Sequence, residues 1–241
     1  MSASEEVEQT TSIHHYADSS DMPDDIQKYW HQRYDIWSLY DEDVWMTNDA
    51  WFGVTPEPVA NKIAEHLIEG TDPSKTIIID AFAGVGGNAI AFARSGRWQQ
   101  VFAIEKDAET MKCGKHNAEV YGVGSKIFWI NGDCFEVLKK RLRSVAKDAV
   151  VFASPPWGGP SYNGDDVFDL KTMQPYSLKD LYDAYAAYAR DFVLYLPRSS
   201  DLNQIAKYAP KYKNQRLEVT HYCMSGWSKA ICIFFGEWTF E

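Results

Sequence analysis

The stretch Thr76-Ile77-Ile78-Ile79-Asp80-Ala81-Phe82-Ala83-Gly84-Val85-Gly86-Gly87 decides the fold of this 241-residue chain. It begins with a short β-branched run, which is typical of a buried strand. The glycine-rich turn that follows lets the backbone approach a ligand closely and opens the N-terminus of a helix that continues to Arg94. A strand, a glycine turn and a helix in this order predict a β-α unit of a parallel sheet.

The same alternation of strands and helices continues to the C-terminus. We expect further strands at 100–105, 126–130, 148–153 and 192–196, and helices at 107–121, 134–144, 178–189 and 202–208. The last two strands, 216–224 and 230–238, meet at Gly226-Trp227 and predict a hairpin. The predicted fold class is therefore α/β and Rossmann-like: a seven-stranded, mainly parallel sheet with helices on both faces and a closing antiparallel hairpin.

Two segments precede this domain, which we place at 71–241. Residues 1–25 hold seven acidic residues and no lysine or arginine, a composition that predicts a disordered tail. Apolar residues at helical spacing predict a helix over 25–40. Thr55-Pro56-Glu57 predicts the start of a second helix, with Thr55 as its N-cap. Residues 26–70 are therefore expected to form a small helical N-terminal extension.

The charge and the cysteines limit the class of protein. The formal net charge is -10, but without the tail 27 acidic residues face 24 basic ones. That balance argues against a long groove that tracks phosphates and leaves a short RNA contact open. The four cysteines form no Cys-x-x-Cys pair, so we expect no metal site, no disulfide framework and a reducing compartment. The sequence has no signal peptide and no apolar run long enough to span a bilayer, which predicts a protein without a membrane partner, in the cytoplasm or nucleus.

Acidic residues follow the first three strands of the predicted sheet: Asp80, Glu105 and Asp133. Ligands of such sheets bind outside the carboxyl ends of the strands. The Glu105 carboxylate, after the second strand, could accept hydrogen bonds from two ribose hydroxyls. Asp133 could accept a hydrogen bond from an adenine amine. Position 89 is alanine where a Gly-x-Gly-x-x-Gly dinucleotide site has its third glycine, and carboxylates repel pyrophosphate. The arrangement instead suits S-adenosylmethionine, which is cationic and has no phosphate; the alternative is three solvated loop residues.

Ser154-Pro155-Pro156-Trp157 follows the fourth strand directly. The two prolines fix φ and donate no N–H, and the residue before them is restricted as well. The segment predicts a rigid turn with outward carbonyls and a fixed ring; a purely packing role is the alternative. It resembles the Asn/Asp/Ser-Pro-Pro-aromatic motif of amino methyltransferases. That resemblance implies that Ser154 and a proline carbonyl accept hydrogen bonds from a target amine while the ring stacks on the target base.

The chemistry of methyl transfer agrees with such a turn. The reaction is an in-line displacement at carbon, so the nitrogen must be held near the methyl group and in line with the sulfur. Two acceptors orient its lone pair, and no strong base is required because the alkylated nitrogen loses its proton readily. Tryptophan is the best cation-π platform, which favours a cationic base such as 7-methylguanine. Trp157 therefore narrows the expected substrate.

Several stretches together resemble the trimethylguanosine synthase family, over about 26–238. They are Trp51-Phe52-Gly53-Val54-Thr55-Pro56-Glu57, Asp80-Ala81-Phe82-Ala83-Gly84-Val85-Gly86-Gly87-Asn88, Asn117-Ala118-Glu119-Val120-Tyr121-Gly122, Trp157-Gly158-Gly159-Pro160 after Ser-Pro-Pro, and Tyr195-Leu196-Pro197-Arg198. The resemblance implies a class I methyltransferase that uses S-adenosylmethionine to convert 7-methylguanosine caps of small nuclear and nucleolar RNAs to the 2,2,7-trimethyl form. It also implies a location in the nucleus, the nucleolus included, or additionally in the cytoplasm, and small ribonucleoprotein core proteins as partners.

The same resemblance assigns roles to individual residues. Trp157 would stack on 7-methylguanine, with Ser154 and Pro155 facing the N2 amine. Asn117, Tyr162 and Arg198 become candidates for cap contacts, Arg198 for the triphosphate. The expected cofactor pocket comprises Thr55, Asp80, Phe82, Gly84, Gly86, Glu105, Lys106, Asp133, Cys134 and Ser154. The extension 26–70 would cover the site.

The chain departs from the family pattern in three places. Ala83 stands where the family often has cysteine, and Glu105 where it often has aspartate. Trp45-Met46-Thr47 lacks the lysine that often faces the cap phosphates, so the source of phosphate affinity is open. Two alternatives also stay open: methylation of an adenine or a protein amine, which Ser154 and Trp157 disfavour, and a non-catalytic cap-binding module. Whether one or two methyl groups are added is likewise undecided.

Overall fold

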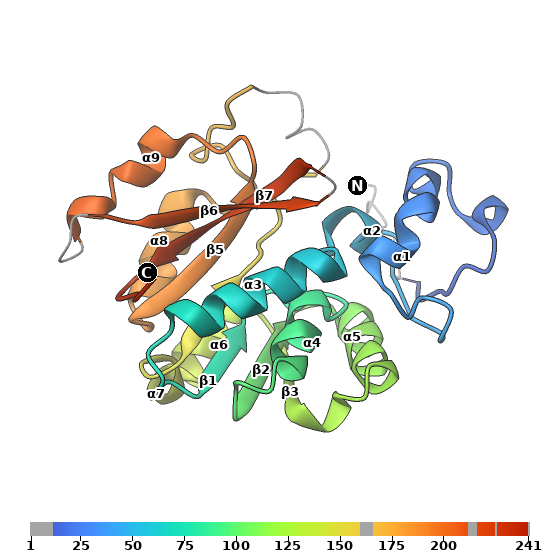
Figure 1. Ribbon diagram of the computed structural model, residues 1–241, viewed down its shortest axis with the longest axis horizontal. Helices are drawn as coiled ribbons and strands as arrows, with labels where there is room; N and C mark the ends of the chain where they lie inside the picture. The colour runs from blue at the N-terminus through green and yellow to red at the C-terminus, as the bar shows by residue number, and fades with distance from the viewer. Residues whose placement is uncertain (1–11, 160–165, 212–215, 225, 241) are drawn as a thin grey trace, which may run out of the picture.

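A seven-stranded sheet forms the centre of the computed structural model, which describes residues 12–159, 166–211, 216–224 and 226–240 (Figure 1). Within those residues the strand order is β3-β2-β1-β4-β5-β7-β6. The strands are β1 (Ile77–Asp80), β2 (Gln100–Glu105), β3 (Ile127–Asn131), β4 (Val150–Ala153), β5 (Asp191–Pro197), β6 (Glu218–Met224) and β7 (Trp227–Phe235).

Strands β1 to β5 pair in parallel, and β7 inserts antiparallel between β5 and β6. This confirms the predicted mainly parallel sheet with a closing hairpin. The prediction was wrong about where β7 begins: it starts at Trp227 and not at Ala230. Gly226 has a φ of +80°, so the chain reverses within a tight turn and the second strand starts at once.

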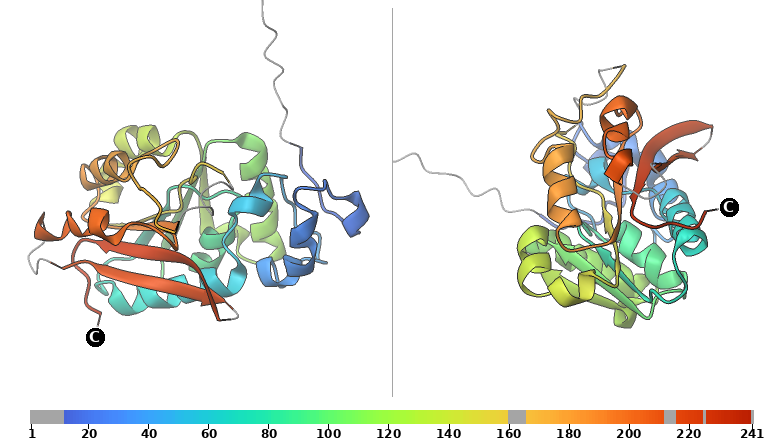
Figure 2. Two further views of the ribbon diagram at one scale, coloured as in Figure 1. Left: turned by 90° about the horizontal axis from the view of Figure 1, so that it is seen from above. Right: turned by 90° about the vertical axis from the view of Figure 1, so that its left-hand side faces the viewer.

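Helices cover both faces of the sheet (Figure 2, right view). One face carries α3 (Glu57–Gly70), α4 (Gly87–Arg94) and α5 (Ala108–Val120). The other carries α6 (Cys134–Lys140), α7 (Arg143–Ala146), α8 (Leu178–Ala186) and α9 (Leu202–Ala206). Helix α3 buries Val59, Ile63 and Leu67, one apolar residue per turn on a single stripe. It therefore belongs to a layer of the main domain as well as to the expected extension.

The continuous helix predicted over 25–40 is wrong. The chain instead forms a 3-10 helix (Gln27–Gln32) and the short helix α1 (Arg33–Ile36), followed later by α2 (Ala50–Gly53). Ile36 and Trp37 are buried, whereas Tyr34 is 47% exposed, so the apolar residues do not share one helical face. Further 3-10 helices are Ser19–Asp21, Gly124–Lys126 and Ala209–Lys211.

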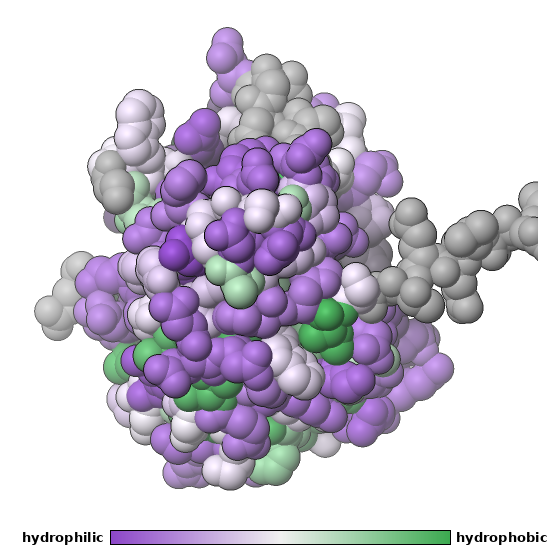
Figure 3. Space-filling model, turned by 90° about the vertical axis from the view of Figure 1, so that its right-hand side faces the viewer, coloured by the Kyte–Doolittle hydropathy of each residue, from purple (hydrophilic) through white to green (hydrophobic). Residues whose placement is uncertain are grey.

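Residues 12–25 contact the body of the protein, which differs from the expected tail. His14 forms an antiparallel bridge with Met46, Met22 is buried, and the Tyr16 hydroxyl donates a hydrogen bond to the Asn48 side chain. The remainder of the expected tail lies outside the described residues. Figure 3 shows this side of the molecule as mainly hydrophilic, with hydrophobic residues in small separate areas. Among the described residues, no helix has the length and apolar character needed to cross a membrane.

Candidate active site

The glycine-rich turn between β1 and α4 presents its backbone to open space at Gly84. Gly84 and Gly86 have φ angles of +54° and +101°, in the left-handed region that favours glycine. A Cβ added at Gly84 would meet no atom within 4 Å, whereas one at Gly87 would lie 3.2 Å from the carbonyl oxygen of Thr55. The turn is thus closed on the side of the N-terminal extension and open at Gly84.

Asp80, the last residue of β1, is fully buried at the base of this turn. Neither of its carboxylate oxygens has a hydrogen-bond partner within normal geometry among the described residues. Burial raises its pKa to about 7, Glu105 adds to the increase, and the nearby amides of Phe82 and Ala89 oppose it. A buried carboxylate is costly to ionise unless a cation or a hydrogen-bond donor pairs with it, so Asp80 is a candidate partner for a cationic ligand.

Glu105 and Asp133 both bind backbone amides at the carboxyl ends of their strands. The Glu105 carboxylate accepts hydrogen bonds from the amides of Gly84 and Asp107, each at 2.9 Å. Burial raises the pKa of Glu105, and these amides oppose the shift. Asp133 caps α6 through Oδ1, which accepts from the amides of Phe135 and Glu136, so Oδ2 takes no part in the cap. Both residues therefore shape the loops beside the glycine turn.

Phe82 and Cys134, both predicted for the cofactor pocket, lie beside Asp133 with three aromatic residues that the sequence analysis missed: Phe135, Tyr176 and Tyr185. Phe82 lies near Phe135 and Tyr176, and the last two rings meet edge to face at 5.0 Å. The Cys134 thiol lies 3.7 Å from the hydroxyl of the buried Tyr185 of α8. Burial raises the pKa of this thiol to about 12, so Cys134 stays neutral. These residues come from four separate segments, and no local pattern links them.

Two residues assigned to the cofactor pocket differ in burial, and one assigned to the cap lies outside the described residues. Lys106 is exposed. Thr55, the expected N-cap of α3, instead accepts a hydrogen bond from the Asn88 side chain at 3.0 Å, because the helix begins two residues later, after Pro56. Tyr162 lies outside the described residues.

The Ser-Pro-Pro-Trp turn stands directly beside Asp80. The amide of Ala81 donates to the carbonyl of Phe152 in β4, which aligns the ends of the two strands. Ser154 is half-buried and Pro155 is buried. The Trp157 indole N–H donates to the Tyr195 carbonyl of β5 at 3.2 Å, and the two rings lie 5.6 Å apart. The tryptophan predicted to stack on substrate is therefore fixed by the neighbouring strand.

Arg198 follows the carboxyl end of β5 and is exposed. Its guanidinium donates to the Ser228 carbonyl at the start of β7, at 3.4 Å. Arg198 is three residues from Tyr195, which holds Trp157. The structure thus brings two of the predicted cap contacts to the same strand end.

Asn117 lies away from any exposed surface. Its side chain is buried and makes three hydrogen bonds: it accepts from the Trp45 amide and donates to the carbonyls of Trp45 and Val85. Trp45 in turn stacks on His116 with ring centroids 3.8 Å apart. In this structure Asn117 joins the N-terminal extension to the glycine turn, and a cap contact for it stays a prediction.

We expect Asn117→Ala to destabilise the protein by about 3 kcal/mol, because it leaves several buried backbone groups unpaired. Chemical denaturation measures this change. Asn131→Ala is the matched control, since Asn131 also donates to two backbone carbonyls but is exposed. A loss no larger than that of the control would contradict the bridging role of Asn117.

Glu57 is a second link that the sequence analysis missed. Its carboxylate accepts hydrogen bonds from the Ser38 amide at 2.8 Å and the Tyr121 hydroxyl at 2.7 Å, and it pairs with Arg94 at 2.6 Å. Burial works against ionisation, but these donors hold the pKa of Glu57 below its usual value. The residue connects the extension with α4 and α5. The pattern Thr55-Pro56-Glu57 predicted the start of a helix, but it did not indicate these hydrogen-bond partners of Glu57.

The strand order, the antiparallel β7 and the acidic strand ends around a glycine turn define a class I, S-adenosylmethionine-dependent methyltransferase. Solved structures share this fold. A putative methyltransferase from Porphyromonas gingivalis superposes with a TM-score of 0.65 at 15% identity, over 90% of this chain and 51% of that one. The human methyltransferase 10 domain containing protein superposes with a TM-score of 0.54 at 15% identity, over 77% of this chain and 85% of that one.

Sequence comparison identifies the family within this class. Residues 75–238 match the model of the RNA cap guanine-N2 methyltransferase family. The chain is 35% identical to trimethylguanosine synthase of Schizosaccharomyces pombe over 98% of its own length and 96% of that protein. It is 33% identical to trimethylguanosine synthase of Saccharomyces cerevisiae, over 89% and 68% of the two chains. The protein belongs to the RNA cap guanine-N2 methyltransferase family and is an S-adenosylmethionine-dependent enzyme, which confirms the resemblance and decides against the adenine, protein-amine and non-catalytic alternatives.

The residues present fit S-adenosylmethionine. Asp80 supplies a buried carboxylate that lacks a donor, and the turn at Gly84 is open. Residues 76–93 contain no lysine or arginine, the side chains that a phosphate-bearing cofactor would require. The carboxylate and the open backbone turn therefore suit a cationic ligand with hydroxyl and amine groups.

Proposed function

We propose that this enzyme methylates the N2 amine of 7-methylguanosine caps twice and so produces 2,2,7-trimethylguanosine caps on small nuclear and nucleolar RNAs. One observation carries the proposal: Trp157, held by the Tyr195 carbonyl, stands next to the Ser154-Pro155 turn at the end of β4. A fixed indole beside two potential acceptors suits a positively charged base with an exocyclic amine. The names of the two fungal relatives support the same product.

The turn performs the reaction by positioning. When bound, S-adenosylmethionine supplies a methyl group on a positively charged sulfur. Ser154 and the Pro155 carbonyl accept the N–H bonds of the amine, two in the first transfer and the one that remains in the second, and so direct its lone pair toward that methyl group. Trp157 holds the base in plane and offers its ring face to the positive charge. The amine loses a proton to solvent after transfer, so no side chain has to act as a strong base.

We further propose roles for the residues around the glycine turn. Asp80 attracts the ammonium end of the cofactor, Glu105 accepts from the ribose hydroxyls, and Asp133 accepts from the adenine amine through Oδ2. The backbone at Gly84 and Gly86 contacts the cofactor closely. The remaining wall of the pocket comprises Thr55, Phe82, Lys106 and Cys134.

The N-terminal extension within 26–70 covers this site in our proposal, with 71–241 as the methyltransferase domain. Contacts at two points support it: Asn117 ties Trp45 to the turn carbonyl of Val85, and Thr55 closes the turn at Gly87. Arg198 remains the proposed contact for the cap triphosphate, whereas the Asn117 side chain is buried and makes three hydrogen bonds within the protein.

The proposed cellular setting follows from the proposed RNAs. Small nuclear and nucleolar RNAs carry core proteins, which makes small ribonucleoprotein proteins the expected partners and the nucleus, the nucleolus included, the expected compartment. All four cysteines are free thiols, which suits a reducing compartment.

Substrate choice tests the function. We expect methyl transfer to 7-methyl-GTP to exceed transfer to GTP in kcat/KM by about 2- to 30-fold from the charge on the ring alone. Mass spectrometry of the product then shows whether one or two methyl groups are added. Equal transfer to GTP would contradict the charge-based selection, and a product with a single methyl group would contradict the trimethylguanosine product.

A further inference from the structure

Trp227 stands out among the nine tryptophans of the chain because it alone is exposed, with 71% of its surface accessible. It is the first residue of β7 and follows directly on Gly226 in the hairpin turn. The other eight are buried or half-buried. An exposed indole costs hydrophobic free energy, and tryptophan is a side chain on which nucleobases stack.

Two basic side chains lie beside this turn in a chain whose formal net charge is -10: Arg198 and Lys229. Lys229 is two residues from Trp227, and the Arg198 guanidinium donates to the Ser228 carbonyl between them. The described residues of this turn, 219–224 and 226–229, include no carboxylate. The turn therefore complements a phosphate backbone in charge.

The register of β5 and β7 places Trp227 in line with the cap site. Tyr195, which holds Trp157, lies two residues before Pro197, and Pro197 pairs with Ala230, three residues after Trp227. Five residues of extended strand span about 17 Å. Arg198 lies between the two ends. An extended triphosphate bridge and its flanking nucleosides can cover such a distance.

We propose that the hairpin turn binds the RNA that directly follows the cap, with Trp227 stacking on a base of the first transcribed nucleotides and with Arg198 and Lys229 contacting phosphates. The inference rests on the proposed function, because it takes the cap base to lie on Trp157. In this proposal Arg198 and Lys229 supply part of the phosphate contact. The sequence did not assign that contact, because no lysine stands near Trp45.

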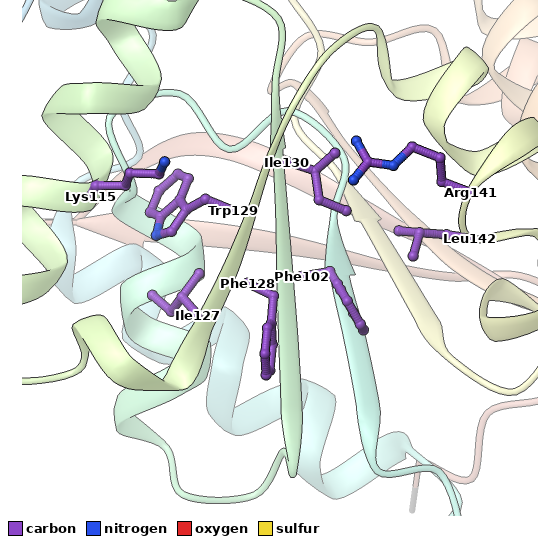
Figure 4. A pocket seen from close by; sticks show the side chains of 8 residues that line it. All are labelled: Phe102, Lys115, Ile127, Phe128, Trp129, Ile130, Arg141 and Leu142. Carbon is purple, nitrogen blue, oxygen red and sulfur yellow. The ribbon is translucent and has the colours of Figure 1, made fainter.

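The opposite edge of the sheet supplies a matched control. An open groove of about 530 Å³ runs along β3, with the rings of Phe102 and Phe128 side by side and Lys115 and Arg141 at its rim (Figure 4). Phe128 is 50% exposed. The groove thus also combines an exposed ring with cations, but β3 is three strands from β4, on the side away from β5. RNA that leaves the cap site toward Arg198 does not reach it.

Steady-state kinetics on two substrates, 7-methyl-GTP and a short capped oligoribonucleotide, test the proposal. Trp227→Ala is expected to raise KM for the capped RNA about 5-fold or more and to leave KM for 7-methyl-GTP unchanged. Trp227→Phe should keep most of the RNA affinity, since it retains a ring. Lys229→Gln should weaken RNA binding and lower the salt dependence of that binding. Phe128→Ala and Arg141→Gln should leave KM for both substrates unchanged.

Two results would overturn the proposal. One is a KM for capped RNA that is the same in Trp227→Ala as in Phe128→Ala. That result would indicate that the exposed ring binds a protein partner and not RNA. The other is an equal rise in KM for both substrates, which would place Trp227 in the cap pocket itself. Fluorescence anisotropy with the same RNA keeps the test separate from the proposed function. If the wild-type enzyme did not methylate 7-methyl-GTP the function would fail, while RNA binding would still report on the hairpin.

Discussion

Replacing Trp157 with alanine is expected to raise KM for 7-methyl-GTP by at least about 10-fold while cofactor binding stays intact. The ring contributes a cation-π term and a stacking term, which together exceed about 1.5 kcal/mol. The indole is held by the Tyr195 carbonyl and is only partly buried, so its removal leaves the cofactor end of the site unchanged. Steady-state kinetics measure the loss, and calorimetry with S-adenosylhomocysteine measures cofactor binding.

Trp157→Phe is the control for this substitution. It keeps a ring at the position but removes the indole N–H that donates to Tyr195. We expect an intermediate KM and a modest loss of stability, because phenylalanine is a weaker platform for positive charge. Unchanged activity of Trp157→Ala, or a loss of cofactor affinity equal to its loss of cap affinity, would contradict the site assignment.

The second large effect concerns Asp80 and pH. Because burial raises the pKa of Asp80 to about 7, the carboxylate is mainly protonated near pH 6 and mainly ionised near pH 8. A cationic ligand binds the ionised form, so we expect affinity for S-adenosylmethionine to rise by about 10-fold between those two pH values. Calorimetry at the two pH values measures it. Asp80→Asn should bind the cofactor weakly, by about 10- to 100-fold, and without this pH dependence.

The same group affects folding stability with the opposite sign. The folded pKa lies above the unfolded value of 3.8, so the folded protein holds this proton more tightly. The contribution is present at low pH and is lost as the pH rises to about 7. Asp80→Asn should therefore be at least as stable as the wild type near pH 8.

A cofactor affinity that is flat with pH in the wild type, or equally pH-dependent in Asp80→Asn, would show that Asp80 does not face the cation.

The sheet was predictable because its signals are local. Buried parallel strands appear as β-branched runs, and each is followed by a turn and a helical pattern. Asp80, Glu105 and Asp133 follow from the same pattern, since the ends of parallel strands share one edge of a sheet. The N-terminal extension was not predictable in the same way. Its aromatic residues recur along the sequence at the spacing of one long helix. In the structure they belong to short 3-10 and α segments and pack in several directions.

What the sequence determined by itself is therefore the β-α order, the acidic strand ends and the rigid Ser154–Trp157 turn, because each depends on neighbouring residues. Only the tertiary structure decided what those residues contact. It joined the Trp157 indole to the Tyr195 carbonyl, used Asn117 as a bridge between Trp45 and Val85, and aligned Trp227 with Tyr195 along the paired strands β5 and β7. These contacts join residues far apart in the chain, and the order of strands and the register of β5 and β7 bring them together.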